Sequence, residues 1–310
     1  MTIDTPTAQL SIRGLSKTYP NGVVALRDVT LDLEPGLFGL LGPNGAGKST
    51  LMRTLATLQD ADAGSVSLVD RDGRAIDVLS DKEGVRRVLG YLPQEFGLSP
   101  RAKATDLLHT FAILKGLVDR GNRNDVVDAL LRRVNLWDHR HKAVGTFSGG
   151  MRQRFGIAVA LLGNPRLIVV DEPTAGLDPA ERSRFHDLLA ALGQDAVVML
   201  STHIVEDVVN LCPRMAILHE GQVRLHGSPA EVCAKLAGRL FGRTVTSEEQ
   251  AQLEADPELP IISTRLVAGR REVRVVGDAA PEGFHAVEPT LEDVYFAVVT
   301  GVAGVAGVWS

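Results

Sequence analysis

The sequence feature that most limits the fold is a glycine-rich segment placed between an apolar run and a helical pattern. Residues 37–41 are continuously apolar, as in a strand that is buried on both faces. The segment Gly42-Pro-Asn-Gly-Ala-Gly-Lys-Ser49 follows, and Leu51, Leu55 and Leu58 then recur at helical spacing. The segment fits the phosphate-binding pattern G-x-x-x-x-G-K-[ST], which requires a strand before it and a helix after it. The chain is therefore predicted to be an α/β protein built around this strand, loop and helix.

Each residue type in the loop has a separate task in binding phosphate. The glycines let the backbone approach closely, so that successive N–H groups and the start of the helix point at the anion. Lys48 supplies a point charge for the β- and γ-phosphate oxygens, and the Ser49 hydroxyl can bind Mg²⁺. We therefore predict a nucleotide site made of Gly42, Pro43, Asn44, Gly45, Ala46, Gly47, Lys48, Ser49 and Thr50.

Two adjacent carboxylates end a second apolar strand. Leu167–Val170 is continuously apolar, and Asp171 and Glu172 follow it directly. In open parallel sheets, ligands bind at this end of the strands. Asp171 is the candidate for holding Mg²⁺ through its water shell, and Glu172 is the candidate general base that polarises an attacking water. Without the phosphate loop, the same pair would also be consistent with a solvated strand end.

Two further polar residues follow apolar strands. Gln94 comes after Leu89–Leu92 and a proline, where a neutral amide suits contact with Mg²⁺ or water. His203 comes after Val197–Leu200, and its imidazole can donate a hydrogen bond to a γ-phosphate. Alone, each would be interpreted as an ordinary loop or structural residue. Their positions at strand ends favour a role in the nucleotide site.

A second anion-binding pattern lies about 100 residues after the first. Ser148-Gly149-Gly150 precedes a predicted apolar helix at Phe155–Leu162, and small residues before a helix leave N–H groups free to bind an anion. One nucleotide can use both segments only if they converge. Either they meet within one chain, or each site is completed by a second chain.

Together these motifs resemble those of the ATP-binding-cassette ATPases. Loop 42–50, Gln94, Ser148-Gly-Gly, Asp171-Glu172, Asp178 and His203 follow the order of that family, and the resemblance covers roughly residues 9–230. The resemblance implies ATP as the nucleotide. It also implies a catalytic set of Lys48, Glu172 and His203 and an Mg²⁺ site at Ser49, Gln94 and Asp171.

In that family two cassettes pack head to tail and bury two ATP molecules between them. The resemblance therefore implies that Ser148, Gly149 and Gly150 reach the γ-phosphate bound by the loop of a second copy. Asp178, in Gly176-Leu-Asp-Pro179, is expected to line the interface. Tyr19 matches the position of an aromatic that stacks on adenine, although a plain strand-end aromatic would also fit there.

The signature segment departs from the commonest family pattern at two positions. Phe147 stands where Leu is usual, and Met151 stands where Gln is usual. The Ser-Gly-Gly cradle is unchanged, so ATP binding is still expected. A contact that the usual Gln side chain makes is not expected, because Met151 stands in its place.

The C-terminal region resembles that of one subfamily. Pro289-Thr-Leu-Glu-Asp-Val-Tyr295 and Leu136-Trp-Asp138 are similar to segments of the daunorubicin-resistance type of drug exporter ATPase. Such ATPases work with a separate membrane-spanning permease. We therefore expect two partners, a second copy of the cassette and a permease, and we expect residues 96–105 and the helices up to 145 to face the permease, with Phe96 and Leu98 as apolar contacts.

The predicted organisation is a P-loop NTPase core with an antiparallel β subdomain and a helical subdomain. The cassette is expected at residues 9–235, with its helical subdomain at about 96–160. Residues 240–300 predict a small α+β unit, in which Ile261–Val267 and Glu272–Val276 form a hairpin. Residues 301–310 are expected to be an apolar tail.

Charge and hydropathy limit the location and the partners of the chain. The 310 residues carry 33 Lys and Arg against 38 Asp and Glu, a net charge of −5 that gives no electrostatic reason to bind nucleic acid. Neither a signal peptide nor a membrane-spanning segment is recognisable. We expect a peripheral location on the cytoplasmic face of the cell membrane, held there by the permease.

The predicted function is ATP hydrolysis that powers a separate permease, which exports drug-like or other hydrophobic compounds. The alternative is a soluble cassette ATPase of DNA repair, translation or cluster assembly, but such proteins typically carry two cassettes, long coiled coils or basic arms. A catalytically dead binding module would lack Glu172 or His203, and both are present. A GTPase would carry a guanine-specific Asn-Lys-x-Asp motif, which the chain lacks.

Overall fold

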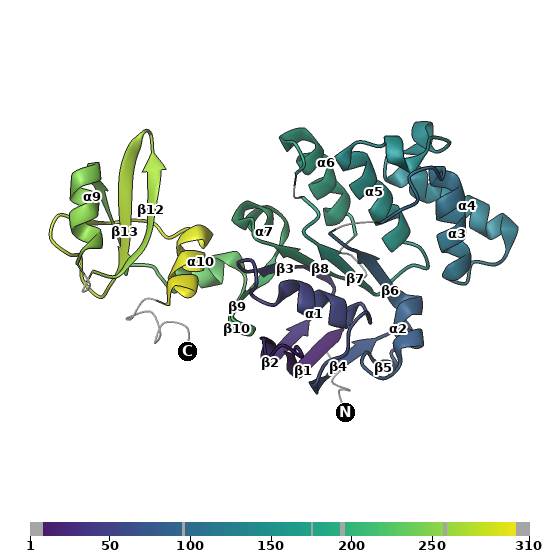
Figure 1. The fold of residues 1–310 in the computed structure, drawn as a ribbon, viewed down its shortest axis with the longest axis horizontal. Coiled ribbons are helices and arrows are strands. Elements are labelled where there is room, and N and C mark those ends of the chain that lie inside the picture. Colours follow the sequence, from purple (N-terminus) through teal and green to yellow (C-terminus); the bar gives the residue numbers. More distant parts are fainter. Residues whose placement is uncertain (1–8, 95–96, 175, 193–195, 257–258, 302–310) are drawn as a thin grey trace, which may run out of the picture.

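A six-stranded sheet forms the centre of the computed structural model, which describes residues 9–94, 97–174, 176–192, 196–256 and 259–301 (Figure 1). Its order is β10-β9-β3-β8-β7-β6, and every neighbouring pair is parallel except β10 and β9. The strands are β3 (Gly36–Leu41), β6 (Leu89–Leu92), β7 (Leu167–Asp171), β8 (Val197–Thr202), β9 (Arg214–His219) and β10 (Gln222–Gly227).

The central strands are apolar throughout because both faces of this sheet are covered. Along β8, Val197 and Met199 belong to one buried cluster, whereas Val198 and Leu200 belong to another. The first cluster includes the helix α1 (Lys48–Leu55) and a four-stranded antiparallel sheet of order β2-β1-β4-β5. Its strands are β1 (Leu10–Thr18), β2 (Val24–Leu33), β4 (Ala63–Val69) and β5 (Ala75–Asp77). In Figure 1, α1 lies between the two sheets.

Helices cover the other face of the central sheet. They are α3 (Ala104–Leu114), α4 (Arg120–Arg133), α5 (Gly149–Ala160), α6 (Pro179–Ala190) and α7 (Val205–Leu211), with two short 3-10 turns at 137–139 and 144–146. Helix α2 (Lys82–Val88) instead packs with the first cluster through its buried residue Val85. The prediction of helices at 100–145 is confirmed. The predicted start of the next helix at Phe155 was wrong, because α5 begins at Gly149 and is capped by Ser148. The first N–H groups of a helix have no acceptor within the helix, so the first turn of α5 tolerates Gly149 and Gly150.

A third sheet of order β12-β13-β11-β14 follows α8 (Pro229–Ala234). Its elements are β11 (Leu240–Val245), α9 (Ser247–Glu254), β12 (Ile261–Val267), β13 (Arg270–Val276), β14 (His285–Ala286) and α10 (Leu291–Thr300). The predicted hairpin is present, with a loop shorter than expected. Ala268 and Gly269 have φ values of 50° and 80°, which suit a two-residue turn that matches the twist of the strands.

Helix α10 joins this third sheet to the cassette. Its buried residues Leu291, Val294 and Ala297 belong to the same apolar cluster as residues of α7, α8 and β9, and α10 contacts all three elements. At its start, the carboxylate of Asp293 receives a hydrogen bond from Arg274 of β13 at 2.5 Å, and both side chains are almost fully buried. The division of the chain into domains at 235–240 stays a prediction, although the buried side chains on its two sides form one cluster.

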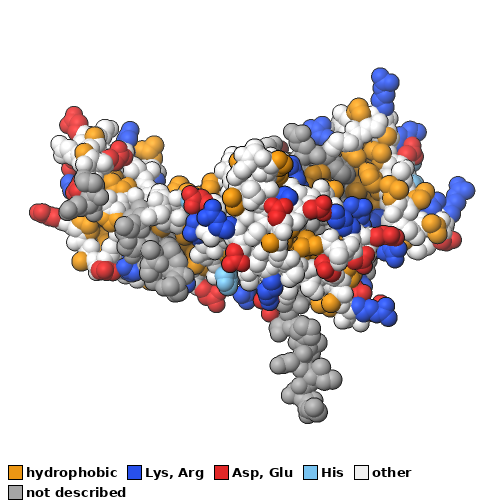
Figure 2. Space-filling view, turned by 60° about the horizontal axis from the view of Figure 1, so that its bottom comes forward, with side chains coloured by type: hydrophobic (Ala, Val, Ile, Leu, Met, Phe, Trp, Pro, Cys, Tyr) orange, Lys and Arg blue, Asp and Glu red, His pale blue; other side chains and the backbone are white. Residues whose placement is uncertain are grey.

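The remaining expectations concern membrane segments, surface charge and the tail. No described helix has the length and apolar composition needed to cross a bilayer. On the face shown in Figure 2, acidic and basic side chains are interspersed. Residues 302–310 of the expected apolar tail lie outside the described part of the chain, as does Phe96. Cys212 is buried, and burial raises the pKa of its thiol to about 12.

Candidate functional site

The carboxyl ends of β3, β7 and β8 bring the predicted residues to one edge of the central sheet. Leu41 at the end of β3 pairs with Thr202 of β8, and Asp171 at the end of β7 pairs with Ser201 of β8. The residues that directly follow these strands must therefore lie close together. The sequence prediction that the glycine-rich loop, the two carboxylates and His203 meet at this edge agrees with the structure.

Packing explains why particular positions of the loop at 42–49 are glycine. A Cβ atom at Gly42 would lie 2.4 Å from the backbone oxygen of Leu218, and one at Gly47 would lie 2.3 Å from that of Ala25. Gly47 also has a φ of 106°, which disfavours any other residue. One side of the loop is thus packed against β2 and β9. The other side lines a cavity.

The Lys48 ammonium is held inside the curve of this loop. It donates hydrogen bonds to the backbone oxygens of Gly42 at 2.6 Å and Pro43 at 3.0 Å, and it lies 3.8 Å from Oε1 of Glu172. Burial lowers the pKa of Lys48, although the nearby carboxylates of Glu172 and Asp171 favour its charged form. A buried ammonium held mainly by neutral carbonyl groups is well placed to bind a phosphate instead.

Glu172 lies between this ammonium and an imidazole. His203 Nδ1 is 3.3 Å from Glu172 Oε1, and 45% of the His203 side chain is exposed against 13% of Glu172. The backbone of Glu172 has a φ of 47°, and its N–H donates to the backbone oxygen of Ser201 at 3.1 Å. Its carboxylate is therefore fixed at the mouth of the phosphate loop, where it can orient a water and accept a proton.

Asp171 supplies a second, more deeply buried carboxylate. Only 3% of the residue is exposed, and its Oδ1 accepts a hydrogen bond from the Ser201 hydroxyl. Burial and the charge of Asp171 together raise the pKa of Tyr91. Asp171, the Ser49 hydroxyl and the Gln94 amide provide hard oxygen atoms of the kind that Mg²⁺ prefers, so the residues fit that ion.

A cavity of about 470 Å³ opens over the loop. Among the predicted residues it is lined by Tyr19, Pro43, Asn44, Gly45, Gly47, Lys48, Ser49, Thr50, Gln94 and Glu172. The Tyr19 hydroxyl is within 3.1 Å of Thr50 Oγ1 and donates to Gln59 Oε1 at 2.9 Å, so its ring is fixed at the wall of the cavity. Gly42 and Ala46 are buried beneath the lining.

The second anion cradle and Asp178 are not among the residues that line this cavity. Ser148 is exposed, and its Oγ accepts the Met151 N–H at 3.2 Å, which leaves the hydroxyl hydrogen free to donate. Asp178 is exposed and caps α6 by accepting the Glu181 N–H at 2.8 Å. A Cβ atom at Gly150 would lie 2.2 Å from Glu181 Oε2, so the starts of α5 and α6 are in contact. Within the described residues of one chain, this pair of helix starts does not contribute to the cavity.

The two unusual signature residues lie below the cradle. Phe147 is 3% exposed and packs edge to face on Phe155, with 6.3 Å between ring centroids. Met151 is half-buried against the same apolar cluster. Both side chains therefore support the Ser148-Gly149-Gly150 segment by apolar packing.

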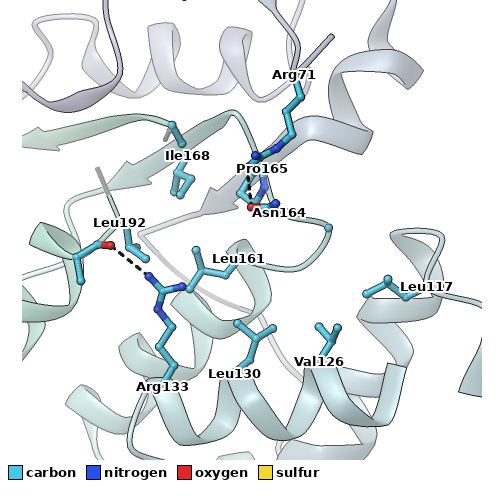
Figure 3. A pocket seen from close by; sticks show the side chains of 13 residues that line it. Arg71, Leu117, Val126, Leu130, Arg133, Leu161, Asn164, Pro165, Ile168 and Leu192 are labelled. Atoms are coloured by element: carbon cyan, nitrogen blue, oxygen red, sulfur yellow. Dashed lines mark hydrogen bonds between the residues drawn. The ribbon is translucent and has the colours of Figure 1, made fainter. Parts of the chain in front are cut away.

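A larger cavity of about 550 Å³ has a different character (Figure 3). It lies near the amino end of β7, where Leu130, Leu161 and Ile168 form apolar walls. Its two arginines donate to neutral oxygens, Arg71 to Asn164 Oδ1 and Arg133 to the backbone oxygen of Ala191. None of the predicted site residues lines it, and none of its described lining residues carries a carboxylate. The candidate site is therefore the smaller cavity.

Two residues that support the site, Ser201 and Asp207, were not predicted from the sequence. The Ser201 hydroxyl donates to Asp171, and the Ser201 carbonyl accepts the Glu172 N–H. The second group is Asp207, which accepts a buried hydrogen bond from the Thr174 hydroxyl. Both depend on partners about 30 residues away in the chain. Such contacts leave no local pattern.

Comparisons with known proteins identify the family. A family model described as ABC transporter matches residues 26–175. The uncharacterized ABC transporter ATP-binding protein YxlF of Bacillus subtilis (strain 168) is 31% identical and spans 94% of this chain and 99% of its own. The daunorubicin/doxorubicin resistance ATP-binding protein DrrA of Streptomyces peucetius is 32% identical and spans 91% of this chain and 81% of its own. A solved dimeric, post-hydrolysis state of the ATP-binding cassette MJ0796, bound to ADP and Pi, matches with a TM-score of 0.63 at 27% identity, over 71% of this chain and 98% of that one.

The chain belongs to the family of ABC transporter ATP-binding proteins. It is the ATP-binding subunit of such a transporter and an ATPase whose activity is coupled to transport. The predicted family, the predicted α/β cassette fold and the predicted ATPase activity are confirmed.

Proposed function

We propose that two copies of this chain pack head to tail and hold each ATP between the phosphate loop of one copy and the Ser148-Gly149-Gly150 cradle of the other. The observation that carries this proposal is the separation of two anion cradles within one chain. Loop 42–49 lines a cavity, whereas Ser148 is exposed at the start of α5 and is not among the residues that line this cavity. The similar cassette MJ0796 is dimeric with ADP and Pi bound, which supports the pairing of two copies.

The proposed roles follow from the geometry of the site. Lys48, whose ammonium donates to the carbonyl groups of Gly42 and Pro43, binds phosphate oxygens instead when ATP enters the cavity. The backbone of 42–50 surrounds the phosphates, and Tyr19 stacks on adenine from the cavity wall. Ser49, Gln94 and Asp171 hold Mg²⁺, which neutralises charge on the phosphates when bound.

Glu172 and His203 act on the γ-phosphate side of the site. Glu172 orients the attacking water and accepts its proton, and His203 donates a hydrogen bond to the γ-phosphate. Glu172 Oε1 and His203 Nδ1 lie 3.3 Å apart, which supports roles for both residues on the same side of the site. Asp178, exposed at the start of α6 beside the Ser148 cradle, lines the interface between the copies and couples the two sites.

The cycle then follows from differential affinity. ATP contacts both copies, so it binds the closed dimer more tightly than the open one and drives closure. Hydrolysis and phosphate release remove the bridging group, and the dimer opens. Alternation between the two states does mechanical work on the permease.

A mixed dimer tests whether each site uses two chains. Lys48→Ala disables a phosphate loop and Ser148→Arg blocks a cradle with a bulky cation, so we expect either variant alone to lose nearly all ATPase activity. When the two variants are mixed, each mixed dimer has one site with both defects and one intact site. We expect activity to reappear on mixing, measured as phosphate release.

The control for this experiment is the mixed dimer in which one chain carries both changes and the other is wild type, because each of its two composite sites then has one defect and this dimer should be inactive. If each site lay within one chain, neither variant could supply an intact site, and the mixture of single variants would stay inactive. That result would contradict the composite site.

We also propose that the chain powers export of hydrophobic, drug-like compounds through a separate permease. Similarity to DrrA, named as a daunorubicin/doxorubicin resistance protein, supports the substrate class. The permease would dock on residues 97–105 and the helices up to 145, where Arg101 and Lys103 are exposed and Leu98 is half-buried. In this arrangement the chain lies on the cytoplasmic face of the membrane. The second candidate, a soluble cassette ATPase, would need no such contact.

Membrane recruitment distinguishes these two functions. Co-expressed with its partner permease, the chain should sediment with membranes, and without that permease it should stay in the supernatant. The double variant Arg101→Glu, Lys103→Glu should return the chain to the supernatant and leave the ATPase activity of the isolated chain unchanged. Exposed charge reversals on α9, Glu248→Lys and Glu254→Lys, provide the control. Sedimentation of the 101/103 variant at the wild-type level would exclude this docking surface.

A further inference from the structure

A fully buried carboxylate lies next to the proposed catalytic residues without contacting the cavity. Asp207, in the first turn of α7, is 0% exposed, and its two oxygens receive hydrogen bonds from three other segments. The Thr174 hydroxyl donates to Oδ2 at 2.6 Å, and Arg182 Nε donates to Oδ1 at 2.8 Å. His186 Nε2 lies 2.9 Å from the same Oδ1. A buried charge with this many partners is a fixed point of the structure.

The two threonines that face Asp207 connect it to the proposed chemistry. Thr174 follows Glu172 by two residues, and Thr202, whose hydroxyl lies 3.4 Å from Asp207 Oδ2, directly precedes His203. Both threonines are almost fully buried, with 3% and 1% of their surface exposed. The Asp207 carboxylate therefore holds the chain just after Glu172, through Thr174, and just before His203, through Thr202.

Glu172 needs such support because of its backbone conformation. Its φ of 47° lies in the left-handed region, which a non-glycine residue keeps only when surrounding contacts maintain it. On one side the Glu172 N–H is fixed by the carbonyl of Ser201. After Glu172 in the chain, the first side-chain hydrogen bond that the structure describes is the one from the Thr174 hydroxyl to Asp207.

We propose that Asp207 is a positioning residue for ATP hydrolysis: by binding Thr174 and Thr202 it holds Glu172 and His203 in the relative geometry that the reaction requires. Arg182 and His186 of α6 complete its environment, so the same carboxylate also fixes the helix that begins at Asp178. This proposal rests on the proposed roles of Glu172 and His203. It adds a residue that does not touch the nucleotide.

The proposal predicts a specific kinetic effect for Asp207→Asn. The amide has the size of the carboxylate, but its NH₂ group faces donors and cannot accept their hydrogen bonds. Displacement of Glu172 should lower kcat roughly 10- to 100-fold, because small errors in the position of a catalytic group are costly. The KM for ATP should change by less than about twofold, since the phosphate loop is untouched.

A conservative pair at Thr174 tests the same contact without removing a buried charge. Thr174→Val keeps the shape and loses the hydroxyl, whereas Thr174→Ser keeps the hydroxyl. We expect the valine variant to reproduce most of the loss in kcat and the serine variant to restore it. A general destabilisation of the fold would not follow the hydroxyl in this way.

Asp293→Asn is the matched control, because Asp293 is an equally buried carboxylate paired with an arginine, Arg274, but lies in the C-terminal unit. Both aspartate variants should lower the thermal midpoint, and only Asp207→Asn should lower kcat at a temperature where both are folded. An equal loss of kcat in the two variants, or wild-type kcat in Thr174→Val, would overturn the proposal.

Glu172→Gln, measured alongside, separates this proposal from the proposed function on which it rests. If Glu172→Gln abolishes turnover while Asp207→Asn and Thr174→Val keep wild-type kcat, the positioning role is wrong and the role of Glu172 stands. If Glu172→Gln itself keeps full turnover, the proposed base is wrong and the positioning role fails with it.

Discussion

The variant Glu172→Gln should bind ATP as tightly as the wild type and hydrolyse it roughly 100- to 10,000-fold more slowly. The amide keeps the size of the side chain and its place between Lys48 and His203, but it cannot accept the proton of the attacking water. Because binding is retained and the bridging phosphate is not removed, the variant should accumulate as an ATP-held dimer. Phosphate release measures the first effect, and light scattering after gel filtration measures the second.

Glu206→Gln is the control for this experiment. Glu206 is an exposed carboxylate on α7, three residues after His203, so its loss changes the local charge without changing the site. This control should hydrolyse ATP at the wild-type rate and should not accumulate as a dimer. Full turnover by Glu172→Gln would remove Glu172 from the role of general base.

Lys48→Ala should lose tight nucleotide binding, with ATP affinity reduced by about 100-fold or more. Hydrogen bonds to a charged group contribute about 1.5–3 kcal/mol each, and Lys48 is the ammonium enclosed by the phosphate loop. The change also removes the donor for two backbone carbonyls, so the thermal midpoint must be measured in parallel. Calorimetric titration with ATP measures the affinity.

Lys115→Ala controls for the loss of those structural contacts. Lys115 is half-buried, and its ammonium also donates to two backbone oxygens, those of Arg86 and Leu89. Burial lowers the pKa of Lys115 as it does that of Lys48. The two variants should therefore lose similar local stability, and only Lys48→Ala should lose ATP. Unchanged ATP affinity in Lys48→Ala would contradict the assignment of the loop.

The residues that meet in the cavity were predictable because their positions follow from sheet geometry. The apolar strands 37–41, 167–170 and 197–200 are recognisable by composition, and the carboxyl ends of parallel strands meet at one edge. This rule alone brings Lys48, Glu172 and His203 together. It does not decide whether Ser148 joins them in the same chain, and that part of the prediction came only from the family resemblance.

Boundaries and side-chain contacts were predicted less well. The helix expected at Phe155 begins at Gly149. Helix α9 is capped by Thr246 and Glu249, although Ser247 and Gln250 have the same spacing. Both pairs fit the capping pattern, and local sequence does not choose between them.

The supporting residues of the site were not predictable, for a different reason. Asp207 is one of many acidic residues in the sequence, and its burial depends on Thr174 and Arg182, which reach it from distant parts of the chain. Three-dimensional packing alone separates it from exposed neighbours such as Glu206.

Helix α10 covers α7, α8 and β9, so the cassette depends on its C-terminal extension to shield this surface. A cassette that ends before residue 240 would leave the surface beneath this helix open to water, and the apolar residues there would favour aggregation. Truncation of the chain before α10 would therefore expose Val208, Val232 and Met215. A shortened cassette stays in solution only if polar side chains replace apolar ones on this surface or another segment covers it.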